Sequence, residues 1–135
     1  MEEKLVILGQ PPSKSNSYNI VKIGGHYSLA KTKALKKYEQ SFFEQCRWRD
    51  RNISNYFELS MDVFFLSKLP DLDNSLKIVL DCLQSCKVIK NDRLCVKIEA
   101  RKFIDRNNAR IELTLREVAE IEVVDSKQPS LDFKD

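Results

Sequence analysis

Pro70-Asp71-Leu72-Asp73-Asn74-Ser75-Leu76-Lys77 is the stretch around which the rest of this 135-residue chain can be organised. A helix is predicted from Asp73 to about Ser85, and Asp73 is placed to cap it with its carboxylate. Lys77 lies four residues further on and therefore on the same helix face, which Asp81 continues. The apolar positions with helical spacing are Leu76, Val79, Leu80 and Leu83.

Strands are predicted on both sides of this helix. Residues 57–65 alternate between apolar and mostly polar side chains, which is typical of a strand with one buried face. After the helix, Lys90–Arg93 is predicted to form a turn that contains Asn91 and Asp92. Two further alternating runs, 94–101 and 110–116, are separated by a turn at 105–108, and we expect them to pair as an antiparallel hairpin.

The amino-terminal half contains weaker signals. Residues 4–8 predict a buried strand that ends at Gly9, and residues 10–17 predict a loop rich in proline and serine. A brief strand at 18–23 stops at two glycines, and a helix capped by Ser28 or Thr32 is predicted to run to about Arg49. The exposed side of this helix is basic, which fits either DNA contact or an ordinary solvated surface.

Length and composition indicate one globular domain. Hydrophobic residues make up 42% of the chain and charged residues 32%, and no apolar run reaches the roughly 20 residues of a membrane span. The amino terminus lacks the layout of a signal peptide, so we expect a cytoplasmic protein that does not engage a membrane. The four cysteines form no CxxC pair, and with a single histidine, His26, they predict reduced structural thiols.

The net charge of +3 conceals a segregation of charge along the chain. Residues 14–51 carry nine Lys/Arg and three acids, whereas residues 52–85 carry two Lys and five acids. Residues 86–110 are again basic, with eight Lys/Arg and three acids, and the chain from 117 onward is acidic. Two basic blocks around an acidic one indicate a polyanionic partner.

The acidic cluster favours metal-assisted chemistry. His26 is the only candidate for a histidine base, which argues against Ser-His and Cys-His sites. The two common glycine-rich phosphate-binding motifs, GxxxxGKS/T and GxGxxG, do not occur in the sequence, so no nucleotide cofactor is expected. Aspartates without histidine favour a hard cation, Mg²⁺ or Mn²⁺, which can polarise a phosphate. A purely structural interpretation stays open, because helix capping and turns are common roles for aspartate.

The pattern Asp71-Leu72-Asp73-Asn74, with Lys77 and then Asp92 before a strand, resembles the RusA family of Holliday-junction resolvases. The segment Pro11-Pro12-Ser13 with Asn16 and the Tyr18 region resembles the amino-terminal signature of that family, and Ile111–Thr114 fits its last strand. The resemblance spans about residues 4–116.

The resemblance implies a small α/β (α+β) homodimer, with a small mixed β-sheet flanked by two helices, that cuts four-way DNA junctions by Mg²⁺-dependent hydrolysis. Residues 1–116 would form the resolvase domain, and 117–135 an acidic, mobile tail. The resemblance places the metal on Asp71, Asp73 and Asp92, with Lys77 close by as a catalytic residue. The two active sites would cut opposing strands symmetrically, in DNA recombination and repair, and many members come from phages and prophages.

Some relatives carry an arginine-rich run just before the paired aspartates, where this chain has only Lys68. We expect the remaining DNA grip to come from other polar residues, which are Lys14, Asn16, Lys22, Lys31, Lys33, Lys90 and Arg93. Two alternatives stay open beside symmetric junction resolution. One is a non-catalytic protein on the same fold that binds branched DNA, and the other is a metal nuclease that acts on flaps or other branched DNA.

Overall fold

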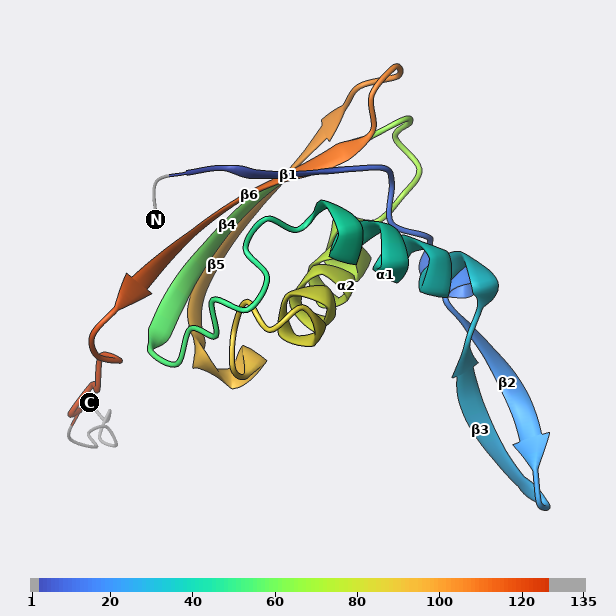
Figure 1. The fold of residues 1–135 in the computed structure, drawn as a ribbon, viewed down its shortest axis with the longest axis horizontal. Helices are drawn as coiled ribbons and strands as arrows, with labels where there is room; N and C mark the ends of the chain where they lie inside the picture. Colours follow the sequence, from blue (N-terminus) through green and yellow to red (C-terminus); the bar gives the residue numbers. More distant parts are fainter. Residues whose placement is uncertain (1–2, 127–135) are drawn as a thin grey trace, which may run out of the picture.

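The computed structural model describes residues 3–126, which form a mixed four-stranded sheet, two α-helices and a separate two-stranded hairpin (Figure 1). The strand order of the main sheet is β1-β6-β4-β5. Along the chain the elements are β1 (Leu5–Leu8), the short 3-10 helix η1 (Lys14–Asn16), β2 (Tyr18–Ile23), β3 (His26–Lys31), α1 (Lys33–Gln45), β4 (Tyr56–Phe65), α2 (Leu72–Ser85), the 3-10 helix η2 (Asp92–Leu94), β5 (Cys95–Ile104) and β6 (Arg110–Val118). The predicted α+β fold is thereby confirmed.

β4 is the central strand of the sheet. It runs antiparallel to β6 on one edge and parallel to β5 on the other. Its inward side chains alternate with outward ones, as the sequence predicts, and each inward side chain is at most 1% exposed. These inward residues are Phe57, Leu59, Met61, Val63 and Phe65.

The predicted antiparallel hairpin between residues 94–101 and 110–116 is wrong, because β4 lies between β5 and β6. The connection passes over the end of β4, where the Asp105 N–H donates to the Phe65 carbonyl at 2.8 Å. Alternation along a strand predicts which face is buried but does not identify its hydrogen-bonded neighbour. With β4 in the middle, both of its edges find partners.

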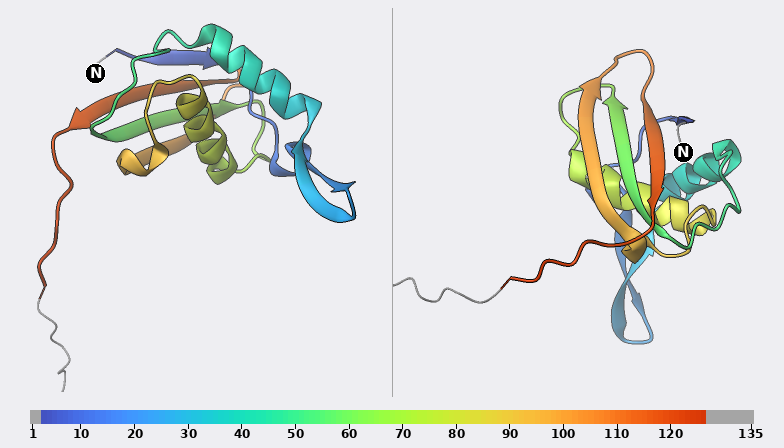
Figure 2. Two further views of the ribbon diagram at one scale, coloured as in Figure 1. Left: turned by 60° about the horizontal axis from the view of Figure 1, so that its bottom comes forward. Right: turned by 90° about the vertical axis from the view of Figure 1, so that its left-hand side faces the viewer.

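Both helices cover the same face of the sheet (Figure 2). α2 is the crossover that joins β4 to its parallel neighbour β5. Such a connection must return the chain to the end of the sheet at which both strands begin. Of the two predicted caps, Ser28 and Thr32, it is Thr32 that caps α1, because its hydroxyl accepts the Leu35 N–H at 3.1 Å. α1 ends at Gln45 and not near Arg49, since Cys46 adopts an extended conformation.

The hairpin of β2 and β3 projects from the body of the molecule (Figure 2). The sequence predicts β2 correctly, but it gives β3 as loop or helix start. Gly24 and Gly25 form the turn with φ of 56° and 83°, values that residues other than glycine adopt at a cost. One face of the hairpin exposes Ile20, Leu29 and Tyr27 by 67–74% of their surface.

β6 extends through Val118, so the first two residues of the expected acidic tail, 117 and 118, belong to this strand. Residues 119–126 have no regular secondary structure, and the rest of the expected tail lies outside the described residues. Within residues 3–126, no helix is long and apolar enough to cross a membrane.

Candidate nuclease site

The paired aspartates lie at the first turn of α2. Asp71, and not Asp73, occupies the N-cap position, with an extended backbone (φ −92°, ψ 134°), so the predicted capping role of Asp73 is wrong. The Asp71 side chain makes no capping hydrogen bond, and Asp73 lies within the first turn. Both side chains are exposed. Two carboxylates, two residues apart in the sequence, therefore lie at the same end of the helix, and neither caps it.

Contacts from distant segments fix the start of α2. The Asn74 side-chain amide donates to the Pro12 carbonyl at 2.9 Å, which ties the proline-rich loop to the helix. The Lys102 ammonium on β5 donates to the carbonyls of Lys68 and Pro70 at 2.8 and 2.5 Å, which holds the segment just before Asp71. Neither contact is predictable from the sequence, where Asn74 is only part of the aspartate motif and Lys102 has the pattern of an ordinary exposed strand residue.

Lys77 lies one helical turn after Asp73, as its spacing predicts. Its Nζ is 3.5 Å from an Asp81 carboxylate oxygen, and its side chain is 74% exposed. Such an exposed i,i+4 pair contributes at most a few tenths of a kcal/mol, about 0.3–0.5. The Lys77 ammonium can therefore exchange this contact for a phosphate oxygen at little cost.

Asp92 lies at the opposite end of α2. Its backbone N–H donates at 2.9 Å to the side-chain oxygen of Gln84, which belongs to the last turn of the helix. Fourteen residues of α-helix span about 21 Å, at 1.5 Å per residue. Within residues 3–126 no group of three His, Cys, Asp or Glu side chains is placed to hold one metal ion. The structure therefore does not bring Asp92 to Asp71 and Asp73 within one chain.

The topology explains this separation. Asp71 and Asp73 follow the carboxyl end of β4, whereas Asp92 precedes the amino end of β5, and the two strands are parallel. The crossover helix between them must therefore run back along the sheet, from the end at which β4 finishes to the end at which β5 begins. Asp73 and Asp92 are close in sequence and yet lie on opposite sides of this crossover.

Asp92 borders an open cavity of about 300 Å³ that Lys31, Asp81, Gln84 and Ser85 also line. Lys31 forms an ion pair with Glu39 at 2.9 Å, and this hydrogen bond raises the pKa of the Lys31 ammonium. A cation expected to contact DNA thus lies on the same surface as Asp92.

The other residues expected to contact DNA lie on several exposed segments. Lys14 and Asn16 are in η1, Lys22 is on β2 with its Nζ 5.7 Å from the centre of the Tyr27 ring, and Lys33 begins α1. Lys68 precedes α2, while Lys90 and Arg93 flank Asp92. All of these side chains are exposed.

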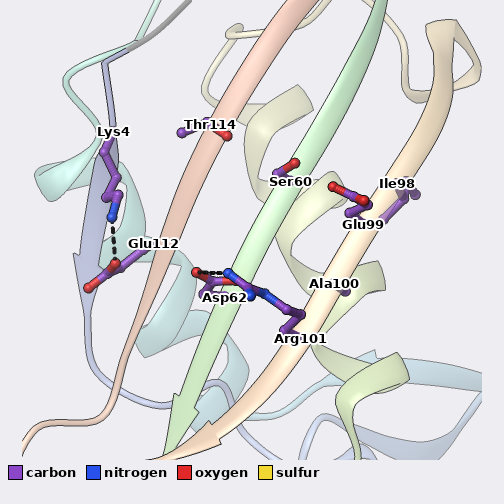
Figure 3. Close-up of a pocket in the computed structure, with 9 residues that line it drawn as sticks. All are labelled: Lys4, Ser60, Asp62, Ile98, Glu99, Ala100, Arg101, Glu112 and Thr114. Atoms are coloured by element: carbon purple, nitrogen blue, oxygen red, sulfur yellow. Dashed lines mark hydrogen bonds and ion pairs between the residues drawn. The ribbon is translucent and has the colours of Figure 1, made fainter.

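Another concavity, of about 690 Å³, lies away from these aspartates on the uncovered face of the sheet (Figure 3). Asp62 there pairs with Arg101 at 3.1 Å, and Glu112 pairs with Lys4 at 3.0 Å. Arg110, which also bonds Glu112, and Lys4 hold the pKa of Glu112 below its usual value. Because Asp62 and Glu112 already have cationic partners, this face is a poor cation site.

The thiols belong mainly to the core. Cys46, Cys82 and Cys86 are at most 4% exposed, and Cys95 is half-buried. The Cys86 hydrogen bond lowers the pKa of Cys46 to about 7, whereas burial raises that of Cys82 to about 12. Since the three core thiols are shielded from solvent, they are not accessible nucleophiles.

A small α+β protein with unpaired carboxylates at a helix start, bordered by exposed lysines, has the attributes of a nuclease that cleaves phosphodiesters. The chain matches the family Endodeoxyribonuclease RusA over residues 9–116 and belongs to that family. It is therefore an endodeoxyribonuclease of the Holliday-junction resolvase type. No curated protein sequence gives a significant match. Nucleases of this family generally depend on a divalent metal ion.

Proposed function

We propose that this protein resolves four-way DNA junctions by symmetric, Mg²⁺-dependent phosphodiester hydrolysis, with Asp71, Asp73 and Asp92 as metal ligands. Carboxylate oxygens without histidine or thiolate suit Mg²⁺, and Mn²⁺ as a substitute. The ion would polarise the scissile phosphate and lower the pKa of a bound water. Lys77 supports the negative charge that develops on the phosphate.

The observation that carries this proposal is the unused carboxylate of Asp71. An aspartate at an N-cap position normally accepts a backbone N–H from the first helical turn, and Asp71 does not. Asp73 is exposed one turn before Lys77, so the same helix end presents two carboxylates and a cation. Structural roles for these side chains would leave this arrangement without an explanation.

We further propose that the active form is a homodimer and that each metal site combines residues of two copies. Asp92 cannot join Asp71 and Asp73 in one chain without unwinding the crossover helix. In a twofold dimer, contacts are reciprocal, so Asp92 of one copy can meet the first turn of α2 of the other, and the converse contact then follows. Two identical composite sites would result, which suits symmetric cuts in opposing strands.

The proposed DNA grip consists of Lys14, Asn16, Lys22, Lys31, Lys33, Lys68, Lys90 and Arg93. Support comes from the exposure of all eight residues and from the position of three of them beside α2: Lys68 precedes its first turn, and Lys90 and Arg93 flank Asp92 after its last turn. With no arginine in the segment just before Asp71, backbone phosphates would be held mainly by lysines, which act as point charges without bidentate geometry. Binding should therefore depend strongly on salt.

Cleavage assays on synthetic four-way junctions, flaps and linear duplexes, each with Mg²⁺, Mn²⁺ or EDTA, test this function. Junctions should be cut at symmetric positions in both metals and left intact in EDTA. Equal cutting of flaps or duplexes would contradict junction selectivity. Binding of junctions without cutting in any metal would contradict the nuclease assignment of this chain.

Mixing two inactive variants tests the composite site. Asp73→Asn and Asp92→Asn proteins should each be inactive alone, because each removes a ligand from both sites. After subunit exchange, half of the sites in a heterodimer would regain all wild-type ligands, so nicking of one strand should return without full resolution. If each site lay within one chain, mixing would restore nothing.

We also propose a role in DNA recombination and repair, a phage or prophage origin and a cytoplasmic location. The location is supported by the free thiols of the core, which suit a reducing compartment.

A further inference from the structure

A second cavity, of about 220 Å³, lies directly beside Asp71 between the proline-rich loop and the start of α2. Its apolar lining consists of Pro11 and Pro12 from the proline-rich loop, Phe65 at the end of β4, and Leu69 and Pro70 from the segment before α2. The volume is below the roughly 300–1,000 Å³ of a site for a drug-sized ligand, so it suits one planar ring system.

The polar lining of this cavity has free hydrogen-bonding capacity. Ser75 is only 1% exposed and lines the cavity, yet its hydroxyl forms no hydrogen bond with any residue in the described part of the chain. Because this hydroxyl opens to the cavity, a ligand that enters can replace solvent there with a direct hydrogen bond to Ser75. Asn74 uses one amide hydrogen for the Pro12 carbonyl, which leaves its side-chain oxygen as an acceptor.

Gln10 and Lys14 complete the polar part of the wall. The Gln10 side-chain oxygen accepts the Leu66 N–H at 2.9 Å, which orients the side chain and leaves its NH₂ group as a donor. Lys14 is exposed and has no ion pair within residues 3–126. The cavity thus combines an apolar body, oriented donors and acceptors, and a cation for a phosphate.

We propose that this cavity receives a single unstacked nucleobase of the DNA, next to the phosphate that is cut. The proposal rests on the nuclease function above, because it places the scissile phosphate at Asp71. A nucleobase has flat apolar faces for the prolines, and a hydrogen-bonding edge for Ser75, Asn74 and Gln10. Bases at the centre of a branched DNA lose stacking at low cost, which favours their entry into a pocket.

The consequence is that this cavity determines which nucleotide flanks the cut. Hydrogen bonds from oriented amides and a hydroxyl distinguish one base edge from another, whereas apolar contacts with the ring faces do not. Removing the Ser75 hydroxyl should reduce preference among cut sites, and filling the cavity should abolish base binding there.

Junction binding in EDTA tests the pocket without cleavage. Four-way junctions with a fixed centre are made with an abasic site at one position at a time around the cut. For the wild-type protein, one position should raise the Kd by about five-fold or more, the lower range for loss of one stacked base. Ser75→Leu should reduce this ratio to about one by filling the cavity.

Ser75→Ala retains the cavity and is well tolerated in a helix, so it covers the case in which Ser75→Leu does not fold. On junctions with a mobile centre, it should reduce the ratio between preferred and other cut sites by roughly 2- to 12-fold, the loss expected for one hydrogen bond. Ser41→Ala, a matched change within α1, should leave both ratios at the wild-type value.

The proposal is overturned if no abasic position weakens binding, or if Ser75→Leu folds and keeps the abasic effect. These results are separable from failure of the nuclease function. Cleavage of junctions without any base dependence would reject the pocket alone. An abasic effect in a protein that cuts nothing would reject the nuclease function and retain the pocket, and a protein that binds no junction would reject both.

Discussion

Asp71 and Asp73 differ in role from what their spacing predicts. The helix begins one residue earlier than expected, so Asp71 takes the N-cap position and Asp73 lies in the first turn. Negative charge near the amino end of a helix is favourable with either placement, because the helix dipole is positive there. The shift leaves both carboxylates free for a cation.

Asp73→Asn should abolish cleavage in Mg²⁺ while junction affinity stays within about two-fold of wild type. The amide preserves size and polarity but removes the charge that a hard cation requires. Cleavage and electrophoretic binding assays measure the two effects separately. Asp125→Asn, a matched change after β6, should alter neither; cleavage retained by Asp73→Asn would reject the metal-ligand role.

Lys77→Ala should slow cleavage by about 100- to 1,000-fold, the range for loss of one charge-stabilising donor. Its effect on junction affinity should be much smaller, because one phosphate contact is only a fraction of the grip. Lys33→Ala gives the contrast: weaker binding, a salt slope lower by about one, and an unchanged rate at saturating DNA. Equal losses of binding and rate for Lys77→Ala would indicate a simple phosphate contact.

At the scale of elements, α2 connects the two halves of the proposed metal site. Its first turn is anchored through Asn74 and the neighbouring Lys102 contacts, and its last turn is anchored to η2 by Gln84. Gln84 carries no charge, and its side-chain oxygen fixes the backbone of Asp92 by accepting the Asp92 N–H. It is a positioning residue in this interpretation.

Gln84→Ala should raise the Mg²⁺ concentration for half-maximal cleavage by about 10-fold or more, the range for groups that orient metal ligands. The free energy of unfolding should change by no more than about 1 kcal/mol, because the hydrogen bond is exposed. Gln84→Glu retains the acceptor and should restore most of the metal affinity. A purely structural role would lower stability and leave the metal requirement unchanged.

For the whole molecule, the two faces of the sheet have separate tasks. The covered face packs against the helices, while the open face carries ion pairs such as Asp62–Arg101 at 3.1 Å and Glu112–Lys4 at 3.0 Å (Figure 3). Charge on this face is largely balanced between partners, and we therefore assign the DNA contacts to the exposed basic side chains near the ends of α2, such as Lys68, Lys90 and Arg93. We propose that the acidic segment after β6 either screens the exposed basic side chains that would bind DNA or is dispensable.

The pairing of Glu112 predicts a pH dependence of stability. Its pKa is lowered in the fold from 4.5, chiefly by Arg110, so the folded form binds the proton more weakly than the unfolded form. The stabilisation is therefore complete above about pH 4.5 and is lost as the pH falls through the lower folded pKa. The pair contributes about 1 kcal/mol or less, because it lies at the surface.

Arg110→Met should be less stable than wild type at pH 7, and this difference should narrow below about pH 4.5. Urea unfolding at several pH values measures it. Part of the difference should persist at low pH, since the guanidinium also packs 3.8 Å from the centre of the Phe64 ring. A difference that is the same at all pH values would contradict the electrostatic explanation.

The sequence by itself determined the periodic elements and the family. Alternation specified β4, helical spacing specified α2, and the sequence narrowed the cap of α1 to Ser28 or Thr32, because each depends on side chains close together in the chain. The aspartate pattern with Lys77 also identified the family that the comparison confirms. The face of β4 that packs in the core was likewise readable from its apolar residues.

Only the tertiary structure decided how these elements meet. It inserted β4 between β5 and β6, since strand partners depend on long-range packing that alternation does not encode. That choice makes α2 a crossover and sets Asp92 about one helix length from Asp71 and Asp73. Ser75 reads as an ordinary helix residue in the sequence, and only folding brings its hydroxyl into a cavity beside Asp71.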